Sequence, residues 1–478
     1  MITSEEMAVV DANAAALGVP RKQLMESSGN AVASAVRERA DAGDAVALVC
    51  GRGNNGGDAF VTARFLSACD VTVHLLGRPA AIGTEIARAN YEALEAADVD
   101  TRTVTDATAL SLEDPDVVVD AMLGTGVTGG LREPEATATR AINATDATVI
   151  AVDVPSGVDA DTGESEGVAV EADHVVTFHD EKPGLGDLDA GVTVADIGIP
   201  AAAELFVERG DLLRLSRDPT AHKGEFGAVR VVGGGPYTGA PALSARAALR
   251  AGADLASVAC PEAVAAEVQG YSENLIVDAL PGDRLGPEHV ETLLAVAEEA
   301  DCVVLGPGLG DHDDTLEAVR AFLASFDGTA VVDADALQVV PDVETEATLV
   351  CTPHQGELRA MGGETADDPA ERADRVATFA EELGATLLVK GAQDVVTDGA
   401  TTRRNRTGNP GMTVGGTGDV LAGVCGAVAC SLDPLDAAAV AAYANGRAGD
   451  LVVEECGYGL TATDLLEAVS RALWPPDE

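Results

Sequence analysis

The chain contains few lysines and few aromatic residues. Only four of its 30 basic residues are lysines, and aromatic residues make up 3% of its 478 positions. Acidic residues number 80, so the formal net charge at pH 7 is −50, and this charge is spread along the whole length. Such a chain repels polyanions, so nucleic acid and anionic membrane surfaces are not expected partners.

This composition, rich in Asp, Glu, Ala and Val, resembles that of proteins adapted to a salt-rich cytoplasm. At molar salt the Debye length is about 3 Å, so repulsion among the acidic side chains would be screened. A halophile-type chain that has replaced most of its lysines is expected to keep an ammonium group where it has a particular task. Lys182, Lys223 and Lys390 all lie in motifs that we assign to sites on other grounds. The alternative is that a few lysines remain by chance.

Paired cysteine motifs, an export signal and long apolar runs are also missing. The eight cysteines show no C-x-x-C pair or zinc-ligand spacing, which is typical of reduced thiols in a cytoplasmic protein. The first residues, MITSEEMAVVD, contain neither a basic region nor an apolar core, so no signal peptide is predicted. Because no window reaches the ~20 apolar residues of a membrane span, we predict a soluble, cytoplasmic protein.

Short apolar strands alternate with amphipathic helical stretches along the whole chain. Continuous apolar strands of this kind indicate parallel sheets that are covered by helices on both faces. Residues 197–200 look like a last strand of the first half, and a polar segment follows before the next strong strand. We therefore predict an α/β protein of two domains, 1–212 and 213–478. The predicted strands include 45–50, 71–76, 117–119, 148–152, 175–178, 228–232, 303–305, 330–332 and 386–389.

The segment NPGMTVGGTGDVLAG, residues 409–423, places one carboxylate directly after a glycine-rich loop. Gly415, Gly416 and Gly418 would let backbone N–H groups converge on an anion, and the apolar run from Val420 is typical of a helix whose positive end faces the same point. Asp419 would then be well placed to take a proton from a hydroxyl group near a bound phosphate. A glycine-rich turn with a helix-capping Asp is the alternative.

A similar loop occurs in the first domain. GRGNNGGD, residues 51–58, joins an apolar strand to an amphipathic segment, at the edge where open α/β sheets bind phosphorylated ligands. The asparagines of this loop add carbonyl oxygens that suit an alkali cation; a turn stabilised by Asx bonds is the alternative. Asp120 and Asp153 each follow a strand and are predicted to face one crevice, although either could instead be a helix N-cap.

These motifs resemble two known families. Residues 409–423 resemble the anion hole and catalytic Asp of the ribokinase-like superfamily, in the branch of the NAD(P)H-hydrate dehydratases. The strings HKGEFGAVRVVGGG (222–235), LGPGLG (305–310), TPHQGEL (352–358) and VKGAQD (389–394) follow in the order of that family. The resemblance spans essentially all of 213–478. It implies a ribokinase-like α/β/α fold and ADP- or ATP-dependent dehydration of the S epimer of the hydrate.

The dehydratase resemblance also implies residue roles. Asp419 would deprotonate the C6 hydroxyl, which attacks the terminal phosphoryl group, and phosphate would then leave. Mg²⁺ is expected to arrive with the nucleotide phosphates. His354, unless it is only a structural hydrogen-bonding residue, would contact the substrate together with Ala240, Gly308 and Asp419. The expected nucleotide-binding residues are Lys390, Gly391, Ala392, Gln393, Asp394 and Gly418.

The strings GRGNNGGD, DAMLGTGVTGG and VDVPSGVDADTG resemble the NAD(P)H-hydrate epimerases, and the match runs from residue 7 to about 199. It implies a Rossmann-like α/β/α domain with K⁺ held by Asn55, Asp120 and Ser156, an Asp153 that contacts the reacting ring, and a Lys182 that contacts phosphate or ring. The expected hydrate-binding residues are Asn54, Asn55, Gly56, Gly57, Asp58, Gly124, Thr125, Gly126, Val127, Thr128, Gly129, Gly130 and Asp153.

The chemistry of epimerisation requires only one acid–base group. In the hydrate, C6 carries a hydroxyl group beside the ring nitrogen, whose lone pair can expel the hydroxyl once a proton reaches its oxygen. The resulting cation is planar at C6, so water can return to either face. A single carboxyl group that gives a proton and then takes one is sufficient, and we assign this role to Asp153.

Together the two halves predict a bifunctional cofactor-repair enzyme, an isomerase joined to a lyase. Its substrates would be NADHX, NADPHX and ADP or ATP, and a homo-oligomer is expected because both families tend to assemble. One alternative is a small-molecule or vitamin kinase with an attached binding domain, which the NNGGD and VPSGVD loops argue against. Another is a noncatalytic, scaffolding first domain, which the retained Asp153 and cation set argue against.

Overall fold

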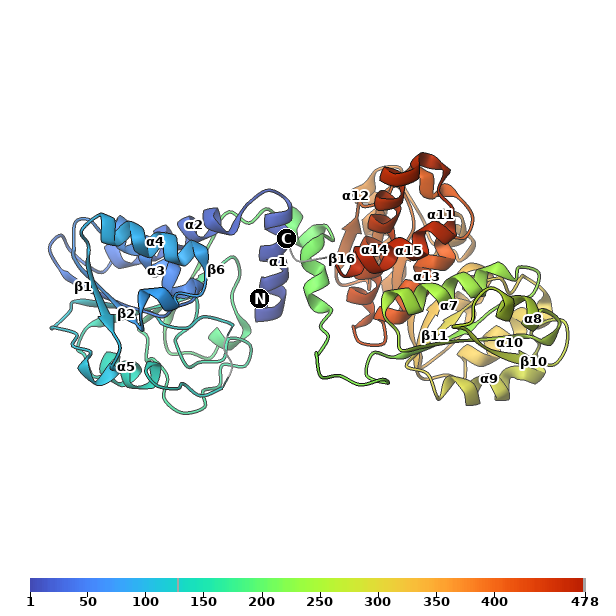
Figure 1. Ribbon diagram of the computed structural model, residues 1–478, viewed down its shortest axis with the longest axis horizontal. Helices are drawn as coiled ribbons and strands as arrows, with labels where there is room; N and C mark the ends of the chain where they lie inside the picture. Colours follow the sequence, from blue (N-terminus) through green and yellow to red (C-terminus); the bar gives the residue numbers. More distant parts are fainter. Residues whose placement is uncertain (127–128, 476–478) are drawn as a thin grey trace. The chain divides into compact units, whose positions relative to one another are not determined.

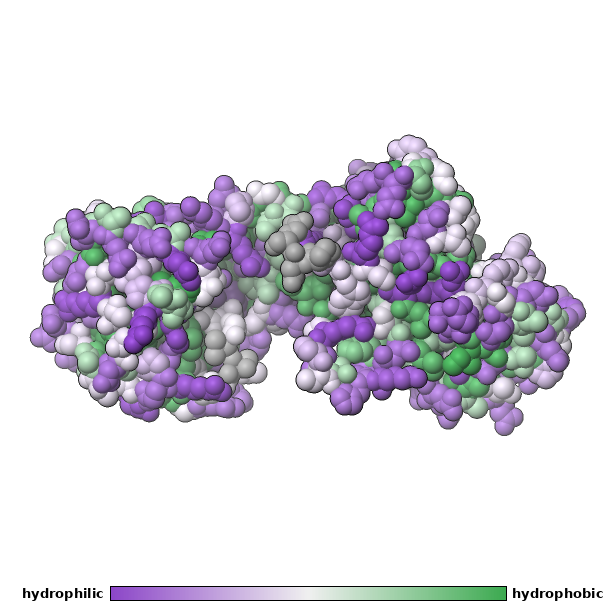
Figure 2. Space-filling model, viewed as in Figure 1, coloured by the Kyte–Doolittle hydropathy of each residue, from purple (hydrophilic) through white to green (hydrophobic). Residues whose placement is uncertain are grey.

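The computed structural model describes residues 1–126 and 129–475. The chain divides into two compact units, Met1–Ala203 and Glu204–Glu478 (Figure 1). Hydrophilic residues cover most of the visible face of each unit, in keeping with a charge that is spread along the chain (Figure 2). Within the described residues, no helix is both long enough and apolar enough to span a bilayer.

The sheet of the first unit has the strand order β3-β2-β1-β4-β5-β6-β7, and all of its pairs are parallel. The elements are α1 Ser4–Ala16, α2 Arg21–Arg37, β1 Ala45–Cys50, α3 Asn54–Phe65, β2 Asp70–Leu76, α4 Glu85–Ala96, β3 Asp100–Val104, β4 Val117–Ala121, α5 Glu135–Ile142, β5 Thr148–Val152, β6 His174–Phe178 and β7 Gly191–Ala195.

Helices cover both faces of this sheet. Leu48 of β1 packs into the core under α2, α3 and α4, whereas its neighbour Val49 packs into the core under α5 (Figure 1). This alternation is the two-residue period of a strand that is buried on both sides. The unit is therefore the three-layer, Rossmann-like domain that the apolar strands predict.

The second unit contains a sheet with the order β10-β9-β8-β11-β12-β13-β14-β15-β16, parallel from β10 to β14 and antiparallel at its last two pairs. The elements are β8 Ala228–Val232, α7 Gly239–Ala251, β9 Leu255–Pro261, α8 Glu262–Gly270, β10 Ile276–Leu280, α9 Val290–Ala297, β11 Cys302–Leu305, α10 Asp313–Leu323, β12 Thr329–Val332, β13 Thr348–Cys351, α11 Gln355–Ala360, α12 Pro369–Leu383, β14 Thr386–Val389, β15 Asp394–Thr397, β16 Thr402–Asn405, α13 Thr417–Val428, α14 Pro434–Cys456 and α15 Ala462–Leu473; the short helix α6, Ala202–Leu205, spans the division between the units.

This unit is also three-layered. One core lies between the sheet and helices α7, α13, α14 and α15, and the other lies under α9, α10 and α12 (Figure 1). Nine of the ten predicted strands are present, each within two residues of its expected bounds. The predicted α/β class and both layer architectures are thus confirmed.

Two predictions near the division between the units differ from the structure: the strand at 197–200 and the domain boundary at 212. Ile197 and Ile199 do not form the last strand of the first unit, which is β7; they are buried in the helix-covered core, so their alternation only imitates a strand. The predicted domain boundary at 212 falls in a segment that pairs with the second unit. There the N–H of Val207 donates to the carbonyl oxygen of Arg404 at 2.9 Å, and Asp211 accepts a 2.8 Å hydrogen bond from Arg403.

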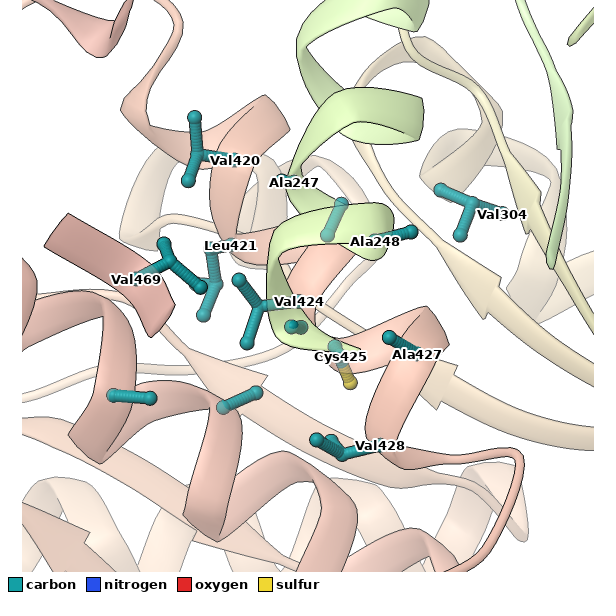
Figure 3. Packing of buried hydrophobic residues seen from close by; sticks show 14 of the residues in the cluster. Ala247, Ala248, Val304, Val420, Leu421, Val424, Cys425, Ala427, Val428 and Val469 are labelled. Atoms are coloured by element: carbon teal, nitrogen blue, oxygen red, sulfur yellow. The ribbon is translucent and has the colours of Figure 1, made fainter. Parts of the chain in front are cut away.

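Helix α13 is held tightly against α7. Figure 3 shows Leu421, Val424 and Val428 of α13 packed among neighbouring helices (Figure 3). A Cβ atom on Gly423 would lie 2.0 Å from the carbonyl oxygen of Ser244, so the two backbones touch there. The Ser244 hydroxyl also donates to the carbonyl oxygen of Asp419 at 2.8 Å. The first turn of α13 therefore has a fixed position relative to the sheet.

Candidate active sites

In the first unit a cavity of about 580 Å³ opens where the strand order reverses, between β1 and β4. Open α/β sheets bind their ligands at this switch point, beyond the carboxyl ends of the strands. Loops after both strands contribute to the wall. The predicted hydrate-binding residues that line the cavity are Asn54, Asn55, Asp58, Gly124, Thr125, Gly126 and Asp153.

The glycine-rich loop of this unit is shorter than predicted. Helix α3 begins at Asn54, so the segment 54–58 forms the start of the helix rather than a loop before it. A Cβ atom on Gly56 would lie 2.2 Å from the carbonyl oxygen of Gly51, and one on Gly57 would lie 2.7 Å from the side chain of Met25. Close packing inside the unit therefore requires these two glycines.

The residues of the second glycine-rich segment, 124–130, do not all lie at the same cavity. Residues 124–126 line the cavity, whereas Val127 and Thr128 lie outside the described residues. Gly129 has a φ of +84° and lines a smaller neighbouring cavity. A Cβ atom on Gly130 would lie 2.4 Å from a backbone carbonyl oxygen, so this glycine is required by packing.

Asn55, Asp120 and Ser156 converge around the backbone of Leu123. Asp120 is fully buried, and its carboxylate accepts hydrogen bonds from the N–H and the hydroxyl of Ser156 at 2.8 and 2.7 Å. The amide of Asn55 donates to the carbonyl oxygen of Leu123 at 2.9 Å, and the N–H of Leu123 donates to the Ser156 hydroxyl at 3.0 Å. Burial raises the pKa of Asp120 to about 6, against the effect of the Ser156 hydrogen bonds.

This cluster suits a hard monovalent cation. It combines a carboxylate with amide, hydroxyl and carbonyl oxygens, which are the donors that hard cations prefer. The Asp120 carboxylate accepts hydrogen bonds from the N–H groups of Met122 and Ser156 and from the Ser156 hydroxyl, all of them neutral, so a bound cation would compensate a buried negative charge. The residues therefore fit the predicted K⁺. The carbonyl group of Leu123 was not predicted, because no side-chain pattern can identify a backbone ligand.

Asp153 lies in the cavity wall in a strained conformation. Its φ of +67° is unusual for a residue with a side chain. Its carboxylate accepts a 3.1 Å hydrogen bond from the Thr177 hydroxyl and lies 3.4 Å from the ammonium group of Lys182. Lys182 is itself fully buried and also donates to the carbonyl oxygens of Phe178 and Asp180. The scarce lysine is thus enclosed directly behind the predicted acid–base group.

Three more carboxyl groups line this cavity, those of Asp11, Asp58 and Glu135. Burial raises the pKa of Asp58 well above its usual range, and the charge of Asp153 adds to this effect. Burial also raises the pKa of Asp11, whose Oδ1 atom has no hydrogen-bond partner among the described residues. Asp58 was predicted because it ends the GRGNNGGD motif. Asp11 was missed because it comes from helix α1, where no local pattern points to a site.

In the second unit, the predicted substrate loops meet at the corresponding switch point, between β8 and β11. A Cβ atom on Gly308, which has a φ of +75°, would lie 2.2 Å from the carbonyl oxygen of Tyr237 and 3.3 Å from the Cβ of Ala240. The structure thus brings Ala240 and Gly308 together. Only a glycine allows this approach.

His354 has the structural role considered for it, and one nitrogen of its ring remains exposed. It is the N-cap of α11, and its Nδ1 accepts the N–H groups of Gly356 and Glu357 at 2.9 Å. This leaves the proton on Nε2, and the side chain is 59% exposed. The Nδ1 atom of the ring therefore caps helix α11, whereas the Nε2–H group remains available as a hydrogen-bond donor.

Lys390 and Asp333 form a partly buried ion pair next to α13. The ammonium group donates to Oδ1 of Asp333 at 2.9 Å and lies 3.8 Å from the carboxylate of Glu357. Burial alone would lower the pKa of Lys390, but the two carboxylates outweigh burial and raise it. A Cβ atom on Gly418 would lie 3.3 Å from this ammonium group. A firmly charged lysine therefore borders the start of α13.

Asp419 lies within the first turn of α13 and not before it. The helix begins at Thr417, earlier than the predicted Val420, because Gly416 adopts the left-handed N-cap conformation with a φ of +97°. Burial raises the pKa of Asp419 to about 7; Asp333 adds to this effect and Lys390 opposes it. A carboxyl group that titrates near neutral pH is suited to general base catalysis.

A cavity in this unit, of about 400 Å³, is lined by five of the six predicted nucleotide-binding residues. They are Lys390, Gly391, Ala392, Asp394 and Gly418. The sixth, Gln393, is turned toward two arginines: its side chain accepts from Arg404, and its carbonyl oxygen accepts from Arg372 at 2.8 Å. Asp333 was not predicted, although it directly follows β12 in the way that Asp153 follows β5.

Comparisons with known proteins agree with both halves of this description. A family model described as NAD(P)H-hydrate dehydratase matches residues 229–471, and one described as YjeF-related protein N-terminus matches residues 21–184. A bifunctional NAD(P)H-hydrate repair enzyme from Methanothermobacter thermautotrophicus is 43% identical over 98% of this chain and 95% of its own length. Another, from Pyrobaculum aerophilum, is 44% identical over 99% of this chain and 98% of its own length.

Among solved structures, a hypothetical protein from Streptococcus mutans aligns with a TM-score of 0.50 at 24% identity. The alignment covers 56% of this chain and 98% of the Streptococcus mutans chain. This likeness concerns the fold alone.

Proposed function

Because this chain belongs to the family of bifunctional NAD(P)H-hydrate repair enzymes, we propose that its two units divide the repair between them. The first unit interconverts the R and S epimers of NADHX and NADPHX, and the second dehydrates the S epimer at the expense of ADP or ATP. The observation that carries this division is one candidate acid–base carboxyl group in each unit: Asp153 in the wall of the first unit's cavity, and Asp419 in the first turn of α13, next to Gly418 of the second unit's cavity wall.

Asp153 is the group that we assign to epimerisation. It gives a proton to the C6 hydroxyl so that water can leave, and it takes a proton from the water that returns to the planar C6. The nearby ammonium group of Lys182 supports this cycle, because it stabilises the carboxylate after the proton has moved. Asp11 and Asp58, whose pKa values are raised, are available as neutral hydrogen-bond donors in the same wall.

Asn55, Asp120, Ser156 and the carbonyl group of Leu123 would hold K⁺. When bound, the ion supplies a fixed positive charge that orders these oxygens and does not titrate. We therefore expect the Tm of the protein to be several degrees higher in KCl than in choline chloride of equal ionic strength. Asp120→Asn should remove this difference. A variant with the same KCl-specific gain as the wild type would contradict the assignment.

In the second unit, Asp419 takes the proton from the C6 hydroxyl, whose oxygen attacks the terminal phosphoryl group and displaces AMP from ADP, or ADP from ATP. Lys390 and the N–H groups at the start of α13 stabilise the phosphate charge. Phosphate then leaves from C6, expelled by the lone pair of the ring nitrogen, and loss of a proton from C5 to the departing phosphate restores the C5=C6 double bond of the dihydronicotinamide. Asp333 and Glu357 border this site and are the carboxylates that would hold Mg²⁺, which neutralises phosphate charge when it binds with the nucleotide.

The pH dependence of dehydration tests the role of Asp419. Its pKa is raised to about 7, and only the ionised form can accept a proton. The kcat/KM for the S hydrate should therefore fall about tenfold per pH unit below pH ~7 and level off above it. An Asp with an ordinary pKa of about 3.9 would give a flat profile over the same range. A flat profile between pH ~6 and ~8.5 would remove Asp419 from this role.

The location and assembly of the enzyme are further parts of the proposal. The eight cysteines are all free, which supports a reducing compartment such as the cytoplasm. The homo-oligomer remains a prediction from the resemblance to the two families.

A further inference from the structure

The 400 Å³ cavity of the second unit contains one buried side chain without a hydrogen-bond partner. Asn445, on helix α14, lines the cavity and is 6% exposed. Its Oδ1 atom is buried and has no partner among the described residues. Because buried polar groups are normally paired and an unpaired one destabilises the fold, such an amide in a cavity wall indicates a missing ligand group.

The other polar side chains of the cavity are already paired inside the protein. Thr407 donates to the carbonyl oxygen of Tyr443 at 3.0 Å, and Thr413 and Thr417 donate to backbone carbonyl groups. Further pairs are Asn409 with Asp450 at 3.0 Å, Asp394 with Asn405 at 2.9 Å, and Lys390 with Asp333 at 2.9 Å. Within the described part of the chain, Asn445 is thus the lining side chain whose hydrogen bonds remain available to a ligand.

The cavity has a phosphate-binding end and an apolar end. Lys390 and Gly418 form the first, beside the start of α13. Met412, Leu421 and Ala442 provide apolar surface in the rest of the wall. Ala442 and Asn445 are three residues apart on α14 and share one helix face, so the free amide lies beside this apolar surface. A planar base would fit between such walls with one edge toward the amide.

We propose that Asn445 selects adenine by hydrogen bonding to the edge of the base that carries the 6-amino group. This inference rests on the proposed function, because it requires that the cavity bind the ADP or ATP used for dehydration. A carboxamide matches adenine well: its oxygen accepts from the 6-amino group, and its NH₂ donates to an adjacent ring nitrogen. Asn445 is thereby the specificity-determining residue for the base.

The test compares two ligands on two proteins. Binding of ADP, and of a purine ribonucleoside diphosphate that lacks the 6-amino group, is measured by calorimetry on the full chain in high KCl. The wild type should bind ADP about tenfold more tightly than the analogue. Asn445→Leu, which removes the amide at similar volume, should bind both ligands equally. Equal affinities of the wild type for ADP and the analogue would overturn the inference, because the amide would then be satisfied by water alone. A preference for ADP that persists in Asn445→Leu would overturn it as well.

Two controls separate this inference from the function on which it rests. Without ligand, Asn445→Leu should keep or raise the Tm, because an unpaired buried amide is removed; Asn445→Ala provides a second variant if the first does not fold. Lys390→Gln should weaken the binding of both ligands while the preference for ADP remains. If Lys390→Gln leaves both affinities unchanged, the cavity is not the nucleotide site, and the proposed function and the inference both fail.

Discussion

Asp419→Asn is expected to reduce the dehydration of pure S hydrate roughly a thousandfold, because the amide cannot accept the proton of the C6 hydroxyl. The substitution preserves the size of the side chain, and the carbonyl oxygen of Asp419 keeps its hydrogen bond from Ser244. The first turn of α13 should therefore keep its position. Recovery of NADH absorbance after addition of ADP or ATP measures the rate.

Asp436→Asn is a matched control for this variant. The pKa of Asp436 is also raised to about 7, mainly by burial, but its carboxylate pairs with Arg214 at 2.8 Å on another part of the second unit. We expect this variant to dehydrate at the wild-type rate. Epimer exchange in Asp419→Asn should also remain unchanged. An Asp419→Asn protein that retained more than a tenth of its dehydration rate would show that another group acts as the base.

Asp153→Asn is expected to slow the exchange of R and S hydrate roughly a hundredfold or more, since the proton of the C6 hydroxyl loses its donor and acceptor. The substitution also leaves the buried ammonium group of Lys182 without its carboxylate partner, so some loss of stability should accompany it. The exchange is measured by chromatography of the two epimers without nucleotide.

The second unit provides an internal control for Asp153→Asn. Dehydration of pure S hydrate by the same protein should proceed at the wild-type rate, because Asp419 and Lys390 belong to the other unit. Together the two variants should each lose one activity and keep the other. Rapid epimer exchange in Asp153→Asn would assign the proton transfer to another carboxyl group in the cavity, such as Asp11 or Asp58.

Much of the fold was predictable because buried parallel strands require continuous apolar residues. That signal is local, so strands such as β1 and β5 were found with their correct bounds. The positions of Asp120 and Asp153 were predicted from the rule that the carboxyl ends of parallel strands meet at one edge, whereas that of Lys390 came from the resemblance to the dehydratases. Helix starts were less predictable. Those of α3 and α13 depend on caps and close backbone contacts, such as the left-handed Gly416.

The unpredicted site residues share one physical feature: their importance comes from contacts with distant segments. Asp11 reaches the first cavity from a helix without a motif, and Leu123 contributes a backbone carbonyl group. Asp333 becomes informative only once Lys390 is found beside it. Asn445 stands out only because its neighbours in the cavity are paired and it is not.

The most direct test of the whole account uses the unmodified protein and a mixed preparation of R and S hydrate in high KCl. On addition of ADP or ATP, NADH absorbance is followed to completion. If the first unit interconverts the epimers and the second dehydrates the S form, the entire hydrate is recovered as NADH. Recovery that stops at the S fraction would contradict the account, because the first unit would then not act as an epimerase.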